Sequence, residues 1–397
     1  MESNERYIRI GTTLYKEVYR PMLSGDKKKV LIQWNMETLR QDHTREFISK
    51  IEKYNGYCII PSHTDYHQIY DGFLNQYEPI PHLPRKGEFT TIRKFLQHIF
   101  GEQLEFGMDY LQLLYLQPLQ KLPILLLVSK ERNTGKTTFL NFLKAVFADN
   151  MTFNTNEDFR SQFNSDWATK LIVGVDEVLL NRREDSERIK NLSTSKSYKA
   201  EAKGKDRNEV SFFAKFVLCS NNENNPIIID SGEIRYWVIK VPKLIEDNTN
   251  ILDGIKKEIP HFLWYLTQRK LSTKNETRMW FRPELLITPA LKKIINYNRG
   301  KVENEMVSII LEIMKLQDIS EYELCINDMA DMLDQRSVKT DHIQIRRILT
   351  ENWQMKPSEK PKRYICQKMT FDGNIFTDSR TGRTYTVKKE IIEKMND

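Results

Sequence analysis

The sequence predicts an α/β fold with a parallel central sheet. Three short apolar runs have the length and composition of buried strands: PILLLV at 123–128, KLIVGVDEV at 170–178 and KFVLCS at 215–220. Helical or loop segments separate these runs, as the long crossovers between parallel strands require. The chain has 397 residues, of which 40% are hydrophobic and 29% charged, so it is long enough for two or three globular domains.

Patterning divides the chain into three regions. Residues 1–88 form an N-terminal accessory region, an α/β or helical extension that ends in the proline-rich connector NQYEPIPHLPRKG. Residues 89–298 form the α/β core, which opens with two helices because apolar residues recur at helical spacing between Ile92 and Leu116. Residues 299–397 contain three amphipathic helices, followed by KRYICQKM and RTYTVKK as strands flanking a turn at DGN or TGR. Three helices and a hairpin are the pattern of a winged helix.

Composition narrows the class of protein. The net charge of +7 is compatible with a nucleic-acid partner but does not require one. The longest apolar run, LPILLLV, is too short to span a bilayer, and the N-terminus lacks the apolar core of a signal peptide. We therefore expect a cytoplasmic protein with no membrane partner.

Cysteine and histidine spacings do not favour a metal site. The four cysteines are widely separated, which favours reduced thiols over a zinc site. His63 and His67 are four residues apart, but no third ligand is evident near them. We expect this pair to serve in loop packing.

The segment SKERNTGKTTF at 129–139 matches the end of the phosphate-loop pattern G-x-x-x-x-G-K-[ST]. In such loops, backbone N–H groups and a helix N-terminus bind phosphate oxygens, the lysine reaches the β- and γ-phosphates, and the hydroxyl holds Mg²⁺. Lys130 occupies the position of the first glycine, so it must adopt whatever turn the glycine would have made. The sequence predicts ATP and Mg²⁺ as ligands, bound by Asn133, Thr134, Gly135, Lys136, Thr137 and Thr138.

Two later strands end in polar residues that suit the same chemistry. Asp176 and Glu177 follow the second apolar run; Asp176 and Thr137 would hold the Mg²⁺ and Glu177 would polarise the attacking water. The alternative is a strand that ends in ordinary surface carboxylates. The third run ends at Ser220, and the amide of Asn221, or of Asn222 as the alternate, would contact the γ-phosphate or the lytic water. A simple turn is the other interpretation of this Asn-Asn pair.

A phosphate loop, a strand ending in Asp-Glu and a strand ending in Ser-Asn-Asn, in this order, resemble the superfamily 3 helicases. More narrowly, residues 90–245 resemble the helicase module of phage, plasmid and poxvirus-type primase-helicases. The resemblance implies an AAA+-like core and a homo-oligomeric ring, expected to be a hexamer, that encloses single-stranded DNA. Primase-helicases carry a polymerising domain first, and residues 1–88 are too short for one. We expect no primase activity here, and a separate primase or replication protein as partner.

The resemblance also assigns two further sets of residues. The segment between the second and third strands looks like the family's β-hairpin that points basic residues into the pore; its DNA-facing charges would be Lys199, Lys203, Lys205 and Arg207. A solvated charged hairpin is the alternative. Arg235 takes the position of the family's arginine finger, which acts on the neighbouring subunit's nucleotide. Relatives often have two adjacent arginines there, whereas this chain has Tyr236 in second place.

These expectations together predict an ATP-dependent DNA helicase or translocase that acts in the replication of a phage, plasmid or other mobile element. Glu177, Asn221 and Arg235 would be its catalytic residues. The alternatives are an ATP-binding replication initiator and a ring ATPase of packaging or defence that does not unwind DNA. A second DNA contact is expected from the third helix of the C-terminal region, which carries Arg346 and Arg347.

Overall fold

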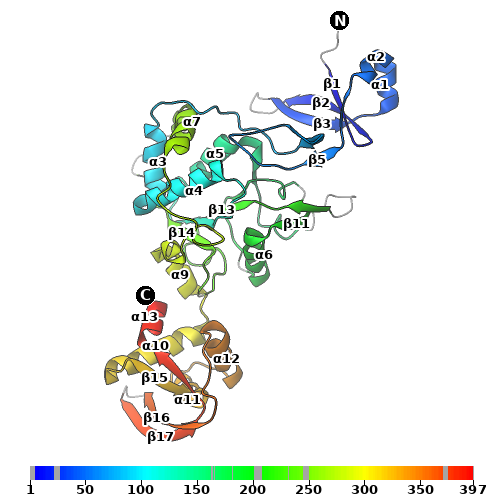
Figure 1. The fold of residues 1–397 in the computed structure, drawn as a ribbon. Helices are drawn as coiled ribbons and strands as arrows, with labels where there is room; N and C mark the ends of the chain where they lie inside the picture. The colour runs from blue at the N-terminus through cyan, green and yellow to red at the C-terminus, as the bar shows by residue number, and fades with distance from the viewer. Residues whose placement is uncertain are drawn as a thin grey trace.

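The structure is a computed structural model that describes residues 5–21, 27–161, 164, 166–180, 182–200, 208–230, 232–244, 250–369 and 374–396. The chain forms three parts that follow one another through the molecule, with the N-terminal and C-terminal parts on different sides of a central α/β part (Figure 1). Within these described ranges, no helix combines the length and the apolar character that crossing a membrane requires.

The N-terminal part contains two small sheets and two short helices. The first sheet has the order β3-β2-β1-β4 and the second has the order β5-β7-β6. Alternation along the strands places Tyr7 and Leu14 against the helices, while Ile8 and Ile10 face Leu74 of the second sheet. The elements are β1 (Arg6–Ile10), β2 (Thr13–Pro21), β3 (Lys27–Gln33), α1 (Met36–Asp42), α2 (Arg45–Ser49), β4 (Glu52–Tyr54), β5 (Gly56–Cys58), β6 (Ile69–Tyr70) and β7 (Phe73–Asn75).

A connector without helix or strand joins this part to the centre, over residues 76–89. Prolines explain its extended form, because they cannot continue a helix. The two helices predicted after it are confirmed as α3 (Thr90–Phe100) and α4 (Leu104–Leu116). The remaining helices of the central part are η1 (Gly101–Gln103), α5 (Lys136–Phe147), η2 (Ala148–Asn150), α6 (Arg183–Thr194), α7 (Ile251–Gln268), α8 (Pro283–Leu286) and α9 (Pro289–Asn298).

The central sheet is parallel, as predicted, and has the order β14-β8-β13-β10-β9. Its strands are β8 (Ile124–Val128), β9 (Met151–Phe153), β10 (Ile172–Val175), β13 (Lys215–Ser220) and β14 (Tyr236–Lys240). The third apolar run, β13, lies between the strand that precedes the predicted phosphate loop and the strand that precedes Asp176. The carboxyl ends of these three neighbouring strands therefore lie side by side.

Helices cover both faces of this sheet, which explains why β8 is apolar at every position. Leu125 and Leu127 pack into the cluster formed with α3, α4, α5 and α7, whereas Ile124, Leu126 and Val128 pack into the cluster formed with α6 and α9. Figure 1 shows these two helical layers on opposite sides of the strands. A strand buried on both faces cannot alternate apolar and polar residues.

A two-stranded hairpin lies between the second and third strands of the core. Strands β11 (Ser197–Ala200) and β12 (Asn208–Ser211) pair antiparallel, so the hairpin expected from the family resemblance is present. Its base is fixed by Tyr198, whose ring contacts those of Trp167 and Phe212.

The C-terminal part begins with α10 (Lys301–Gln317), and its cluster of apolar residues, from Val302 to Ile392, is separate from those of the core. The three predicted helices are present, the third continuing from α12 into a π-helical turn, η3. The other elements are β15 (Glu321–Cys325), α11 (Ile326–Gln335), α12 (His342–Arg347), η3 (Ile348–Asn352), β16 (Lys362–Met369), β17 (Ile375–Gly382), β18 (Thr384–Lys388) and α13 (Lys389–Asn396).

The strand pairing in this part differs from the prediction. KRYICQKM forms β16, but it pairs with β17, which had not been predicted as a strand. RTYTVKK contains β18, and β18 pairs with β15 instead. Polar residues at Thr377, Asp378 and Ser379 concealed β17, because this strand is largely exposed. A helix-rich unit with a hairpin is thus present, and its assignment to the winged-helix class stays a prediction.

Candidate nucleotide site

The predicted phosphate loop, residues 129–135, connects the buried end of β8 to the first turn of α5. Gly135 caps the helix in the left-handed region, with φ of 85°, where a side chain would strain the backbone. Asn133 is also left-handed, with φ of 53°, a conformation that asparagine tolerates better than most residues. Lys136 opens the helix and its side chain is buried; its Nζ donates to Thr134 Oγ1 at 3.0 Å. The lysine thus lies beside the first N–H groups of α5, which lack partners within the helix.

Three segments hold the loop from outside. The carbonyl oxygen of Thr134 lies 3.0 Å from Nε2 of His98 on α3. The carbonyl oxygen of Asn133 accepts from the Leu244 amide at 3.1 Å, and the Cys219 thiol on β13 contacts the Lys136 carbonyl at 3.7 Å. His98 and Leu244 are not part of any recognisable pattern, so sequence reasoning missed these contacts.

Lys130, at the position of the first glycine in the phosphate-loop pattern, has an ordinary backbone conformation. Lys130 has no positive φ, so the position does not need glycine; the left-handed residues of the loop are Asn133 and Gly135. The Lys130 amide donates to Oε1 of Glu223 at 2.9 Å. Glu223 was also missed, although it is the one charged residue in the polar segment SNNENNP.

Asp176, Glu177 and Asn221 lie next to the loop, at the carboxyl ends of the strands. Thr137 Oγ1 donates to Asp176 Oδ2 at 2.8 Å, and Asn221 Nδ2 donates to Glu177 Oε1 at 2.9 Å. A cavity of about 300 Å³ is lined by Arg132, Asn133, Thr134, Gly135, Lys136, Thr137, Thr138, Asp176, Glu177, Ser220 and Asn221. The three motifs therefore share one cavity, and apart from Arg235 all residues expected to bind or hydrolyse the nucleotide line it.

Asn221 and Asn222 have different surroundings. Asn221 is exposed and faces Glu177, whereas Asn222 folds back on its own turn: its Oδ1 accepts from the amides of Asn224 at 2.9 Å and Asn225 at 3.0 Å. Of the two, Asn221 alone lines the cavity that contains Lys136.

The electrostatics of the cavity follow from one buried cation and two carboxylates. Burial lowers the pKa of Lys136, while Cys219, Asp176 and Glu177 oppose this shift. Removing the lysine would leave the two carboxylates without this counter-charge. An anionic ligand would supply the negative charge that best stabilises the ammonium group.

The donor set suits Mg²⁺. The Thr137 hydroxyl and the Asp176 carboxylate are hard oxygen ligands in hydrogen-bond contact, and both line the cavity next to the loop. Mg²⁺ is commonly bound through one or two carboxylates together with waters and phosphate oxygens. Among the residues that the structure describes, no three or more His, Cys, Asp or Glu side chains are grouped so that they could hold a metal ion.

Arg235 lies at the other end of the strands, where β8 and β14 begin. Its carbonyl accepts from the Ile124 amide at the start of β8, whereas the phosphate loop follows the end of that strand at Val128. The strand rise separates the two ends by about 15 Å. The Arg235 guanidinium donates to Glu233 Oε2 at 2.8 Å. Tyr236 is fully buried, so its side chain cannot take the place of a second arginine at the surface. Arg235 is therefore not brought into the cavity of its own chain.

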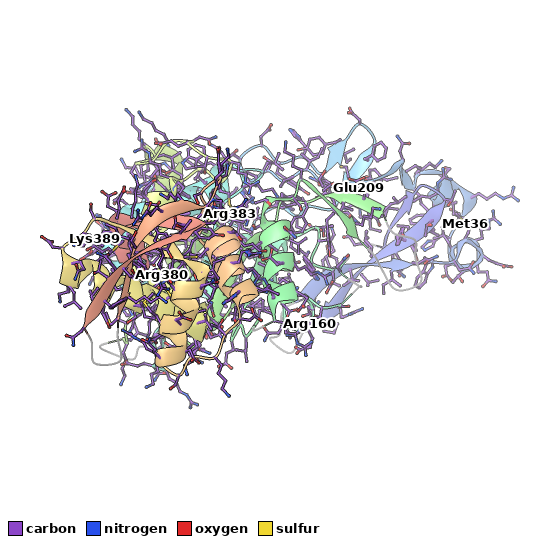
Figure 2. The ribbon with its side chains drawn as sticks, turned by 90° about the horizontal axis from the view of Figure 1, so that it is seen from below. Met36, Arg160, Glu209, Arg380, Arg383 and Lys389 are labelled. Atoms are coloured by element: carbon purple, nitrogen blue, oxygen red, sulfur yellow. The ribbon has the colours of Figure 1, made fainter. Side chains whose placement is uncertain are left out.

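Of the predicted DNA-binding residues, Lys199 alone lies in the described part of the hairpin, where it is exposed and opposite Glu209. The others, Lys203, Lys205 and Arg207, lie outside the described residues. In the C-terminal part, Arg346 and Arg347 are exposed as expected. Arg347 lines a cavity of about 620 Å³ that also includes Arg183 and Asp230 of the core. Figure 2 shows Arg380 and Arg383 on this part, distant from Met36.

Comparisons with known proteins agree with the architecture. Residues 127–235, the stretch from the phosphate loop to Arg235, match a protein family of unknown function, DUF5906. A curated relative, the DNA primase-polymerase of Nitratiruptor phage NrS-1, is 24% identical in an alignment 186 residues long, which covers 44% of this chain. The match spans 26% of that relative's length.

Solved structures of the C-terminal region of NrS-1 (residues 305–718) are similar in fold. One has a TM-score of 0.59 with 16% identity, covering 89% of this chain and 84% of that chain; a second has a TM-score of 0.58 with 17% identity over the same shares. A JCV helicase structure matches 56% of this chain at a TM-score of 0.30, which is too low to relate the two folds.

Proposed function

We propose that this chain is an ATP-hydrolysing motor of the superfamily 3 helicase type, which moves along DNA during the replication of a phage, plasmid or other mobile element. One observation carries the proposal: Thr137 contacts Asp176 and Asn221 contacts Glu177 around a cavity that also contains Lys136. Residues from three separate strand ends are thereby arranged for phosphoryl chemistry. The similarity to a phage DNA primase-polymerase supports the replication setting.

Each residue at the cavity has a distinct task in the hydrolysis of ATP. Lys136 binds β- and γ-phosphate oxygens, together with the N–H groups at the start of α5. Glu177 accepts a hydrogen bond from the lytic water and polarises it, while Asn221 holds the Glu177 carboxylate and the water in place. Thr137 and Asp176 would hold Mg²⁺, which when bound neutralises charge on the phosphates.

The position of Arg235 supports a shared site between subunits. Arg235 lies at the amino ends of its own strands, and the cavity lies at their carboxyl ends. Arg235 can therefore stabilise phosphate charge only in the cavity of a neighbouring chain. A ring, proposed as a hexamer, would place each Arg235 against the next subunit's loop. The basic residues of the hairpin, Lys199, Lys203, Lys205 and Arg207, would then contact single-stranded DNA within the ring.

The first test compares ATP hydrolysis by the wild-type protein and Lys136→Ala, with and without single-stranded DNA. We expect DNA-stimulated turnover in the wild type and a loss of about 100-fold or more in Lys136→Ala, because the ammonium group binds the reacting phosphates. Lys94→Ala, at an exposed position on α3, is the matched control and should retain full activity. Equal rates for Lys136→Ala and the wild type would contradict the proposal.

Strand displacement separates the proposed motor from its alternatives. A helicase displaces a labelled strand from a forked duplex in the presence of ATP, and Lys136→Ala does not. ATP binding without turnover would instead indicate a replication initiator. Turnover without strand displacement would indicate a ring ATPase of packaging or defence.

A further inference from the structure

The first three residues of the phosphate loop have their amides bound by the protein itself. The Ser129 amide donates to the Ser220 carbonyl at 3.1 Å, which continues the ladder between β8 and β13. The Glu131 amide donates to Ser129 Oγ at 3.2 Å. Between them, the Lys130 amide donates to the Glu223 carboxylate at 2.9 Å. Of these three bonds, the one at Lys130 alone depends on a side chain from a different segment.

Glu223 is itself fixed from three sides. Its side chain is 9% exposed, and besides the Lys130 amide it contacts Lys293 Nζ at 2.9 Å and Lys240 Nζ at 3.3 Å. Burial alone would raise the pKa of Glu223, but the hydrogen bonds from Lys130, Lys293 and Lys240 outweigh it and lower the pKa to about 2. The carboxylate is therefore ionised at neutral pH and bridges the loop to the end of β14 and to α9.

The turn that presents Glu223 is closed by its own hydrogen bonds and carries Asn221 as well. Ser220 Oγ accepts from the Asn222 amide at 3.1 Å, and Asn222 Oδ1 accepts from the two amides that follow Glu223. Asn221 points from this turn to Glu177, while Glu223 points to Lys130. Both side chains also line a second cavity of about 600 Å³, which adjoins the first at Glu177 and Asn221.

We propose that Glu223 is a positioning residue for the phosphate loop: its carboxylate binds the Lys130 amide and thereby holds the opening turn in the form that accepts a nucleotide. The effect on nucleotide binding rests on the proposed function, because the loop must bind a nucleotide. Glu223 does not touch the phosphates in this role. It acts through Lys130, at the position where the usual loop pattern has glycine.

Charge alone predicts the opposite effect, which makes the role testable. A carboxylate near a triphosphate repels it, so its removal would tighten ATP binding and would also free Lys240 and Lys293. The positioning role predicts weaker binding when the acceptor is lost. Glu223→Gln separates the two, because it removes the charge but keeps an oxygen that can accept from the Lys130 amide.

The experiment uses the full chain with two measurements: titration with a fluorescent ATP analogue, and hydrogen exchange of the segment containing Lys130 in nucleotide-free protein. Glu223→Ala should weaken analogue binding on the order of tenfold and speed exchange in that segment. Glu223→Gln should stay within about twofold of the wild type in both. Two variants serve as controls. Lys293→Ala removes one ammonium partner of Glu223 but leaves the Glu223 carboxylate in place. Glu46→Ala removes a carboxylate that pairs with Lys50 in the N-terminal part.

Tighter binding by Glu223→Ala, or unchanged exchange at the loop in that variant, would overturn the positioning role. Equal losses in Glu223→Ala and Glu223→Gln would do the same, because the retained acceptor would then have no effect. If the wild-type protein binds no nucleotide, the proposed function fails, and the exchange measurement alone still decides whether Glu223 holds the loop.

Discussion

At the scale of the residue, a buried amine at the start of β13 opposes the stability of the core. Lys215 is 1% exposed, and its Nζ donates to the Pro118 carbonyl. Burial lowers the pKa of Lys215 well below its usual range, and the positive charge of Lys121 lowers it further. Because the folded chain holds a proton here less readily than the unfolded chain, this group reduces the free energy of unfolding below the usual pKa of a lysine.

We expect Lys215→Met to stabilise the protein by about 1–3 kcal/mol at pH 7, because an apolar side chain of similar length carries no desolvation cost. Stability rises with pH wherever the unfolded state binds more protons, so the wild type should approach the variant as the pH rises toward 10. Urea unfolding of both proteins at pH 7 and pH 9.5 measures this difference. A difference that does not depend on pH would show that Lys215 is charged in the folded protein.

At the scale of the element, the predicted phosphate loop is held by contacts with residues outside its own sequence pattern. The sequence predicted Lys136, Thr137 and the helix that follows, because backbone chemistry requires them at that spacing. It assigned the unusual turn to Lys130, whereas the left-handed positions are Asn133 and Gly135. A backbone dihedral depends on how neighbouring segments hold the chain, and one of these neighbours, Glu223, is 93 residues away.

The same limit explains the error in the C-terminal strands. Apolar alternation identified β16 and β18, but partner choice depends on registers that a single segment does not specify. β17 is polar and mostly exposed, so it carried no hydrophobic signal. In the core, by contrast, strands buried on both faces gave continuous apolar runs, and the sequence predicted the strands at 124–128, 172–175 and 215–220.

Replacing Lys130 with glycine should therefore not improve the loop. Because Lys130 already has an ordinary φ, glycine would add only freedom to the unfolded chain, and we expect Lys130→Gly to destabilise the protein by about 0.5–1 kcal/mol. ATP affinity should stay equal or fall slightly. Thermal unfolding and ATP-analogue titration test this together, and a severalfold gain in affinity would show that lysine restricts the loop after all.

At the scale of the whole molecule, the proposed site would be divided between the two ends of the strands of one sheet. The cavity with Lys136 and Glu177 lies at the carboxyl ends of the strands, and Arg235 precedes the amino end of β14. A head-to-tail ring of identical chains would bring the amino ends of the strands in one subunit to the carboxyl ends in the next, at every interface. In the proposed ring, Lys136→Ala and Arg235→Ala would therefore damage opposite sides of an interface, although each should abolish turnover alone.

Mixing these two inactive proteins should restore ATP hydrolysis. An interface in which an Arg235→Ala chain provides the cavity and a Lys136→Ala chain provides the arginine contains every group, and random assembly makes about a quarter of the interfaces intact. The control mixes Lys136→Ala with Glu177→Gln: both changes lie on the cavity side, so no interface can be complete. Steady-state ATPase assays of the mixtures, after exchange of subunits, measure the recovery. No activity above that of the separate variants would show that Arg235 does not act on a neighbouring chain.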